Sequence, residues 1–189
     1  MAMPAQHTEW TVEMVRALPD DGNRYEVIDG ELFVTPAPSV PHQRAVLELA
    51  YLVGPYVKAH RIGEVLFSPV GAIVNGPRKF VQPDLFVVPL VSGAPMRAWT
   101  EVGRLLLAVE VLSPSTEHTD RGRKRALYKD KGVLQYWIVD ADERTVERWR
   151  VDDSPVEMLT ESLQWQPDPD APPLVIDLRG YFDRVHGLA

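Results

Sequence analysis

Two acidic residues occupy positions at which a carboxylate needs an explanation. Glu110 interrupts the apolar run 105–112, and Asp84 follows Pro83 immediately before the apolar run 85–88. A carboxylate inside an apolar strand costs several kcal/mol unless it is paired, protonated or bound to a metal. If the two runs are neighbouring strands, the two acids converge and form an oxygen-rich site, which suits Mg²⁺ or Mn²⁺. Such an ion supports phosphoryl chemistry as a Lewis acid and as an activator of water.

Each acid also has a structural interpretation that the sequence leaves open. Glu110 fits the solvent face of a strand, or an ion pair with an arginine. The tripeptide Gln82-Pro83-Asp84 fits a turn or a strand entry, because proline cannot donate to the ladder and is confined to strand starts, edges and bulges. Two converging acids about 5–10 Å apart that bind no metal would instead indicate a hydrolase of sugars.

A cluster of positive charge follows the second apolar run. The segment 116–131 predicts a very polar helix, which Gly132 closes at its C′ position. A solvated helix face accounts for such a segment, and an i,i+4 pair between Asp120 and Lys124 contributes only ~0.2–0.5 kcal/mol. The alternative is that a lysine of this helix supplies positive charge to the two acids. The basic residues of the segment are Arg121, Arg123, Lys124, Arg125, Lys129 and Lys131.

The elements that must position these residues begin with a helix and a hairpin. Thr8 predicts the start of an amphipathic helix that ends at Pro19. The runs 25–28 and 31–34 predict a hairpin around the dipeptide Asp29-Gly30, because glycine accepts the positive φ that a tight turn requires.

A longer helix follows the hairpin. Ser39 predicts its N-cap, Pro41 lies in its first turn, and an apolar stripe continues to Val53. Pro55 predicts a kink in this helix, or a restart of it.

The remaining apolar runs predict a sheet. The run 105–112 is nearly continuous and indicates a central strand that is covered on both faces. Residues 152–173 are rich in Asp and Pro and indicate a peripheral segment, and Tyr181-Phe182 indicates a turn that docks onto the body. Further strands are predicted at 64–74, 80–88, 133–139, 145–150 and 174–176.

Six strings of the sequence, taken in order, resemble one protein family. Pro83-Asp84 and Glu110-Val-Leu resemble the PD-(D/E)XK signature of restriction-endonuclease-like nucleases. The isolated signature is weakly specific, whereas the ordered set is strongly specific and is similar to the Uma-two family of restriction endonucleases over roughly residues 10–185. The strings are Tyr25-Glu-Val-Ile-Asp-Gly-Glu-Leu, Pro41-His-Gln, Val81-Gln-Pro-Asp, Glu110-Val-Leu-Ser-Pro-Ser-Thr, Asp120-Arg-Gly-Arg-Lys and Gly132-Val-Leu-Gln-Tyr-Trp-Ile-Val-Asp.

This resemblance implies a fold and an activity. The expected fold is α/β (mixed α+β), with a restriction-endonuclease-like αβββαβ core in which helices flank a mixed central sheet, an N-terminal hairpin and C-terminal strands. We expect a single nuclease domain over residues 1–189, with its core at 10–185. The implied activity is hydrolysis of phosphodiester bonds in DNA with Mg²⁺ or Mn²⁺ as cofactor.

The resemblance also implies roles for individual residues. Asp84 and Glu110 would be catalytic metal ligands, with the backbone carbonyl of Val111 as a third ligand. The signature expects a lysine two positions after Glu110, where this chain has Leu112, and leucine cannot orient a nucleophile. In the resembling family this role is thought to move to the following helix, where Lys124 is the matching position.

Four further residues are candidates for the site. Glu26 matches another acidic position of the family and could be an outer metal ligand, although a surface strand residue is an equal interpretation. Arg121 and Arg125 are candidates for substrate binding through phosphates. His42, at a helix start, could contact a phosphate or the attacking water, or have a structural role near the cap.

The composition excludes several other classes of protein. Of 189 residues, 45% are hydrophobic and 25% are charged, which is typical of globular chains. The absence of cysteine excludes a disulfide framework, a thiolate zinc site, an iron–sulfur cluster and a cysteine nucleophile. No run reaches the ~20 apolar residues of a membrane span, so we expect a cytoplasmic protein that does not bind membranes.

The net charge keeps a second function class open. A formal charge of −7 opposes indiscriminate attraction to nucleic acid. It favours, as an alternative, a catalytically silent binding or regulatory module with the nuclease fold. If the chain cuts both strands of DNA, we expect a homodimer, because two-fold symmetry is the commonest arrangement of oligomers.

Overall fold

The computed structural model describes residues 9–68, 73–74, 76–98, 103–113, 116–152 and 155–188. The largest sheet in this part has six strands: β3 (Gly63–Phe67), β6 (Leu85–Pro89), β7 (Leu107–Val111), β8 (Gln135–Asp140), β9 (Thr145–Arg150) and β10 (Glu157–Leu159). Their order across the sheet is β10-β9-β8-β7-β6-β3. β7 and β8 are parallel and all other neighbours are antiparallel, so the sheet is mixed as predicted.

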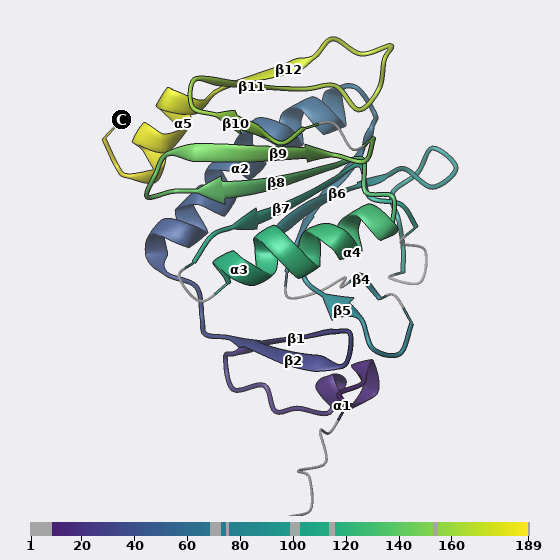
Figure 1. Ribbon diagram of the computed structural model, residues 1–189. Coiled ribbons are helices and arrows are strands. Elements are labelled where there is room, and N and C mark those ends of the chain that lie inside the picture. Colours follow the sequence, from purple (N-terminus) through teal and green to yellow (C-terminus); the bar gives the residue numbers. More distant parts are fainter. Residues whose placement is uncertain are drawn as a thin grey trace, which may run out of the picture.

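Helices cover both faces of this sheet (Figure 1). On one face lie α2 (Val40–Ala59) and α5 (Leu178–Val185). The other face is covered by α3 (Glu117–Thr119), the π-helical turn η2 (Asp120–Lys124) and α4 (Arg125–Asp130). The chain order α2-β3-β6-β7-α3/α4-β8 is the predicted αβββαβ core, and this expectation is confirmed.

The alternation of side chains along β7 determines toward which face of the sheet Glu110 points. All five residues of the strand are buried, as the apolar run predicts for a central strand. Leu107, Val109 and Val111 belong to the core beneath α2, whereas Ala108 belongs to the core beneath α4. Because successive side chains of a strand point to opposite faces, Glu110 points toward the face that α3, η2 and α4 cover.

A second sheet is built on the predicted hairpin. It contains β1 (Arg24–Ile28), β2 (Glu31–Thr35), β4 (Ile73–Val74) and β5 (Phe80–Val81), in the order β2-β1-β5-β4. Asp29 and Gly30 join β1 to β2 with φ values of 54° and 84°, which is the conformation of a type I′ turn. The N-terminal helix α1 (Val12–Arg16) is capped by Thr11 and not by the predicted Thr8, which lies outside the described residues.

Helix α2 begins as predicted and continues further than predicted. The Ser39 hydroxyl caps it by accepting a hydrogen bond from the His42 N–H at 3.3 Å. The helix does not restart at Pro55, because Val40–Ala59 is one helix with that proline inside it. Buried residues on both sides of the proline, Val53 and Val57, pack on the sheet and hold the last turn in place.

The C-terminal part is less peripheral than its composition suggests. Within the segment 152–173, β10 completes one edge of the large sheet, and β11 (Ser162–Trp165) pairs with β12 (Leu174–Asp177). Trp165 of this segment is fully buried against Trp137. Tyr181 and Phe182 lie in helix α5 and not in a turn, and both are buried in the core.

Candidate active site

Strand register brings the two predicted acids together. β6 and β7 are antiparallel, and Leu85 pairs with Val109. One step further along the same register, Asp84 stands opposite Glu110. The Val111 N–H donates to Asp84 Oδ2 at 2.8 Å, which ties the loop before β6 to the end of β7. The arrangement that the sequence required, two acids on neighbouring strands, is present.

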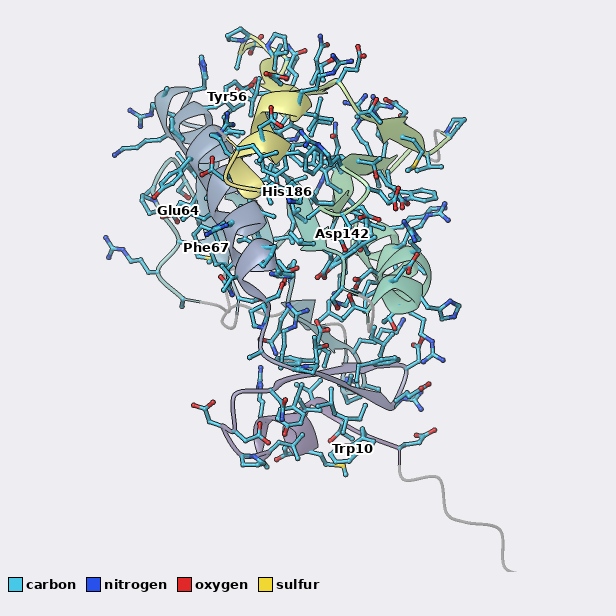
Figure 2. The ribbon with its side chains drawn as sticks, turned by 90° about the vertical axis from the view of Figure 1, so that its left-hand side faces the viewer. Trp10, Tyr56, Glu64, Phe67, Asp142 and His186 are labelled. Carbon is cyan, nitrogen blue, oxygen red and sulfur yellow. The ribbon has the colours of Figure 1, made fainter. Side chains whose placement is uncertain are left out.

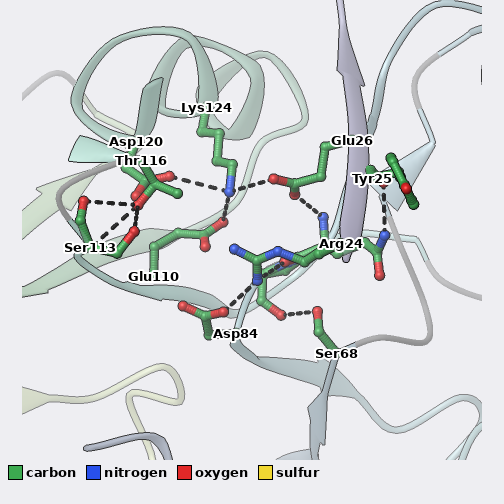
Figure 3. A network of polar contacts seen from close by, with 12 residues as sticks. Arg24, Tyr25, Glu26, Ser68, Asp84, Glu110, Ser113, Thr116, Asp120 and Lys124 are labelled. Carbon is green, nitrogen blue, oxygen red and sulfur yellow. Dashed lines mark hydrogen bonds and ion pairs between the residues drawn. The ribbon is translucent and has the colours of Figure 1, made fainter. Parts of the chain in front are cut away.

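Lys124 lies over Glu110 from the covering helix (Figure 3). Its Nζ is 3.0 Å from Glu110 Oε1, 2.9 Å from Glu26 Oε2 and 3.2 Å from Asp120 Oδ1. All four side chains are 1% exposed. The interpretation of Lys124 and Asp120 as part of a solvated helix face is therefore wrong. The π-helical turn η2, which begins at Asp120 and ends at Lys124, has both of these residues buried.

Two further donors fix the acids that surround Lys124. The Tyr128 hydroxyl donates to Glu110 Oε1 at 2.6 Å. The Gln82 N–H donates to Glu26 Oε1 at 2.6 Å, so the segment before β6 also anchors the hairpin. Glu26 is thus buried between two elements, and the alternative of a surface strand residue is wrong.

Asp84 has a different set of partners, which face a cleft. Arg24 Nη1 lies 2.5 Å from Oδ1, and His42 Nε2 lies 3.1 Å from Oδ2. Together with the Val111 N–H, these contacts hold both carboxylate oxygens. Three elements therefore meet at Asp84: the start of β1, the first turn of α2 and the end of β7.

The surroundings shift the pKa values of Asp84 and Glu110 in opposite directions. Burial raises the pKa of Glu110 well above its usual value, and the negative charges of Asp120 and Asp84 add to this effect although Lys124 opposes it. Burial would also raise the pKa of Asp84, but the hydrogen bond from His42 and the charge of Arg24 hold that pKa below its usual value. Asp84 is therefore the ionised member of the pair, and Glu110 retains a proton more readily. A pair of carboxyl groups separated in this way is typical of sites that carry out acid–base or metal chemistry.

The two cations are held in their charged forms. Burial would lower the pKa of Lys124, but Glu110, Glu26 and Asp120 outweigh burial and raise it. Arg24 behaves in the same way, since Asp84, Glu110 and Glu26 together overcome the effect of burial on its pKa.

The donor set of this cluster fits a divalent cation. Four carboxylates face only two cations, which leaves a formal charge of −2 when all are ionised; the members are Glu26, Asp84, Glu110, Asp120, Arg24 and Lys124. The second oxygen of Glu110, Oε2, is buried and has no hydrogen-bond partner among the described residues. No three His, Asp or Glu side chains of the described residues are grouped closely enough to hold a metal by themselves. Mg²⁺ needs no such group, because it commonly binds through one or two carboxylates and keeps several waters.

A cleft of about 1030 Å³ gives access to one side of the cluster. Arg24, His42, Asp84 and Val111 line it, whereas Glu110 and Lys124 lie behind its wall. Figure 2 views this region with Phe67 on one side of the lower part of α2 and Asp142 on the other, and both residues also line the cleft.

The other predicted substrate contacts lie elsewhere. Arg121 pairs with Glu117 and, at 2.5 Å, with Glu147 of β9. Arg125 lies over the ring of Trp149, 3.6 Å from its centroid. Neither arginine lines the cleft, and their contact with a substrate stays a prediction. His42 is the predicted substrate-binding residue that does line it.

Sequence reasoning missed three residues of the site. Arg24 is the cation on Asp84, and only its place at the start of a hairpin next to acidic Glu26 could have drawn attention to it. Asp120 was interpreted as a surface partner of Lys124. Tyr128 is buried in the core, and its hydroxyl donates to Glu110.

Comparison with known proteins shows the family of the chain. The family model "Uma2: Putative restriction endonuclease" matches residues 12–179. The chain belongs to the Uma2 family. This is the family that the six strings resemble, so the sequence expectation is confirmed.

The fold of the chain also occurs in a solved structure. The chain is similar to a "putative nuclease belonging to DUF820" from Anabaena variabilis ATCC 29413, with 20% identity, a TM-score of 0.77, and coverage of 93% of this chain and 99% of that chain. At this identity the likeness shows that this Uma2 chain and that protein share a fold. No curated protein matches the chain. Among the described residues of this Uma2 protein, no helix is long and apolar enough to cross a bilayer.

Proposed function

We propose that this Uma2 protein is a divalent-metal-dependent endonuclease that hydrolyses phosphodiester bonds in DNA. The observation that carries the proposal is the meeting of Asp84, Glu110 and Lys124 at one end of β6 and β7. These are the residues that the nuclease signature requires, with the lysine supplied by the covering helix. The open oxygen of Glu110 and the excess negative charge supply an independent reason for a cation at this point.

The metal would be held by Asp84 and Glu110, with the Val111 carbonyl as a further oxygen. When bound, Mg²⁺ or Mn²⁺ supplies Lewis-acid stabilisation to the phosphate that is attacked. The protein's own residues prepare this position: Lys124 and Tyr128 bind one oxygen of Glu110 and leave the other open. The Val111 N–H and His42 hold Asp84 at the cleft wall, where a phosphate can approach it.

Lys124 would act through charge. In a buried site with low dielectric response, its ammonium opposes the negative charge that develops on the phosphate. Its contacts with Glu26 and Asp120 fix its position before a substrate arrives. Fixed charges of this kind need no reorganisation during the reaction.

The test measures metal binding and cleavage in the same set of proteins. Supercoiled DNA, linear DNA and RNA are incubated with Mg²⁺, with Mn²⁺ or with EDTA, and Mn²⁺ binding is followed by calorimetry. We expect cleavage of DNA that EDTA abolishes. Asp84→Asn and Glu110→Gln should each lower turnover by more than about a hundredfold and weaken Mn²⁺ binding. Glu117→Gln is the matched control, because Glu117 lines the cleft but belongs to neither acid's cluster.

Folding and substrate class decide how the outcome is interpreted. Circular dichroism verifies that each variant is folded, and Glu110→Gln carries the test if Asp84→Asn, which removes the ion-pair partner of Arg24, does not fold. Normal Mn²⁺ affinity in Glu110→Gln would contradict the assignment of the metal site. Cleavage of RNA and not of DNA would contradict the proposed substrate.

One observation favours a second function, a catalytically silent binding or regulatory module. Six acids line the cleft, whereas Arg24 is its one Lys or Arg side chain among the described residues. This balance opposes the approach of a phosphate backbone. The acids are Asp20, Asp84, Glu117, Asp140, Asp142 and Glu143. Absence of both Mn²⁺ binding and cleavage in the folded wild type would select this function.

The remaining properties belong to the same proposal. We infer one nuclease domain over residues 1–189 that works in the cytoplasm as a homodimer, so that two sites face the two strands of DNA. Light scattering during gel filtration measures the mass in solution. A monomer that still cuts both strands would contradict the dimer.

A further inference from the structure

Arg24 pairs with Asp84, one of the two acids that would hold a cation, and the charge of the other, Glu110, also stabilises it. We propose that Arg24 is a displaceable counter-ion: its guanidinium neutralises Asp84 while no metal is bound, and it moves into the cleft when a divalent cation binds. This inference rests on the proposed metal-dependent function and adds to it a residue that sets the affinity for the metal.

The location of the guanidinium is the first argument. Arg24 Nη1 lies 2.5 Å from Asp84 Oδ1. In Figure 3 the guanidinium lies between the carboxylates of Asp84 and Glu110. Glu110 and Glu26 are also close enough to stabilise its charge. A divalent ion on Asp84 and Glu110 would meet a positive charge in this place, and two cations cannot share one carboxylate pair without strong repulsion.

The incomplete bonding of the guanidinium is the second argument. Arginine offers five N–H donors. Nη1 donates two hydrogen bonds, one to Asp84 Oδ1 and one to the Gln82 carbonyl at 3.2 Å. Nε is buried and has no hydrogen-bond partner among the described residues. A guanidinium that leaves a buried donor unsatisfied loses less on departure than one held by a full set of acceptors.

Asp84, in contrast, does not depend on Arg24 for its position. The Val111 N–H, at 2.8 Å, and His42, at 3.1 Å, both hold its other oxygen, Oδ2. Arg24 can therefore leave while the carboxylate stays in place. It also has a route, because its side chain is 16% exposed and lines the cleft. In the cleft, it would become the cation available to a phosphate group.

The first test compares Mn²⁺ affinity by calorimetry in four proteins: the wild type, Arg24→Gln, Arg24→Lys and Arg123→Gln. Arg24→Gln removes the competing charge and should bind Mn²⁺ at least about tenfold more tightly. Arg24→Lys keeps a cation and should fall between this variant and the wild type. Arg123→Gln removes one exposed positive charge from the same helix as Lys124 and should stay within about twofold of the wild type, because exposed charges are screened.

The second test follows the movement in the wild type, so it does not depend on a variant that folds. Phenylglyoxal modifies accessible arginines, and peptide mass spectrometry reports the rate at each one. Saturating Mg²⁺ should raise the rate at Arg24 at least about fivefold and leave the rate at Arg123 unchanged, because only Arg24 leaves a carboxylate that the metal takes.

The outcomes separate this inference from the proposed function. If the wild type binds Mn²⁺ but Arg24→Gln binds it no more tightly, and Arg24 keeps the same reactivity with Mg²⁺, then Arg24 is a fixed clamp of Asp84 and only this inference fails. If neither the wild type nor Arg24→Gln binds Mn²⁺ at millimolar concentration, the metal-dependent function fails and this inference fails with it.

Discussion

Lys124 and Glu110 form one ion pair, but replacing each by a neutral residue of similar size should change the free energy of unfolding in opposite directions. Lys124 and Glu110 are 3.0 Å apart and equally buried. A simple ion pair would lose similar stability from either side. The surroundings are asymmetric, however, because Lys124 faces three carboxylates, whereas Glu110 has further acids nearby.

Lys124→Met removes the cation and keeps most of the volume. The carboxylates of Glu26, Glu110 and Asp120 then face one another without it. Loss of one partner from a buried pair costs about 3–5 kcal/mol. For a chain of this size, 1 kcal/mol shifts the melting temperature by about 2–4 °C, so we expect a decrease of about 6–20 °C. The loss should shrink near pH 3, where the carboxylates are protonated.

Glu110→Gln removes one excess negative charge and keeps an oxygen for Lys124 and Tyr128. The pKa of Glu110 is raised in the folded state, so the native protein binds a proton that the unfolded chain releases. Stability of the wild type therefore falls as the pH rises from about 4.5, the unfolded value, to the folded pKa. Above the folded pKa, the free energy of unfolding is lower by about 1.4 kcal/mol for each pH unit that separates the folded from the unfolded pKa. Glu110→Gln should match the wild type below pH 4 and exceed its stability above this window.

The assay is thermal unfolding by circular dichroism in EDTA between pH 3 and pH 8. Lys129→Met, an exposed change in the same helix, is the control and should shift the free energy of unfolding by less than about 0.5 kcal/mol. The reasoning is refuted if Lys124→Met has the same melting temperature as the wild type at pH 7. It is also refuted if Glu110→Gln loses as much stability as Lys124→Met.

Two further predictions concern single contacts. Tyr128→Phe removes the hydroxyl that donates to Glu110 at 2.6 Å and should cost about 1.5–3 kcal/mol in urea unfolding, whereas Tyr51→Phe, at an exposed position, should cost almost nothing; equal effects would contradict the importance of the hydrogen bond. Gly63→Ala places a Cβ 1.9 Å from the Val88 carbonyl oxygen and should cost about 3 kcal/mol in the same assay, while Gly103→Ala, which has open space, should be near neutral.

The sequence predicted the structure correctly where neighbouring residues allowed only one local conformation or one side-chain direction. Asp29-Gly30 between two apolar runs allowed a tight hairpin turn, and the structure has it. The acid inside the run 105–112 required a compensating group, and the alternation of β7 turns Glu110 toward the one that the helix provides. Both predictions depended on residues close together in the chain, or on a period of two that a strand cannot avoid.

Other features depended on long-range packing that the sequence does not display. Glu26 and Gln82 are 56 residues apart, and their hydrogen bond exists because two different segments meet beneath the helix. The helicity of Tyr181 and Phe182 follows from their burial against α2, since the Tyr181 hydroxyl donates to the Ala45 carbonyl across 136 residues. A composition argument that identified the segment 152–173 as peripheral could not anticipate that Trp165 packs against Trp137.

The site has its lysine at position 124 on the covering helix and not at position 112 at the end of the strand, and this changes the direction from which the ammonium approaches. A lysine two positions after Glu110 would share its strand face and extend toward the cleft, but Leu112 stands there and packs with the core beneath α4. The ammonium of Lys124 arrives instead from above the sheet, through the π-helical turn that starts at Asp120. It is 1% exposed and does not line the cleft, so it sets the charge and orientation of Glu110 and would act on a phosphate in the cleft through its charge, without direct contact. Of Arg24 and Lys124, the two cations of the site, only Arg24 lines the cleft, because it enters the site from β1 and not from the covering helix.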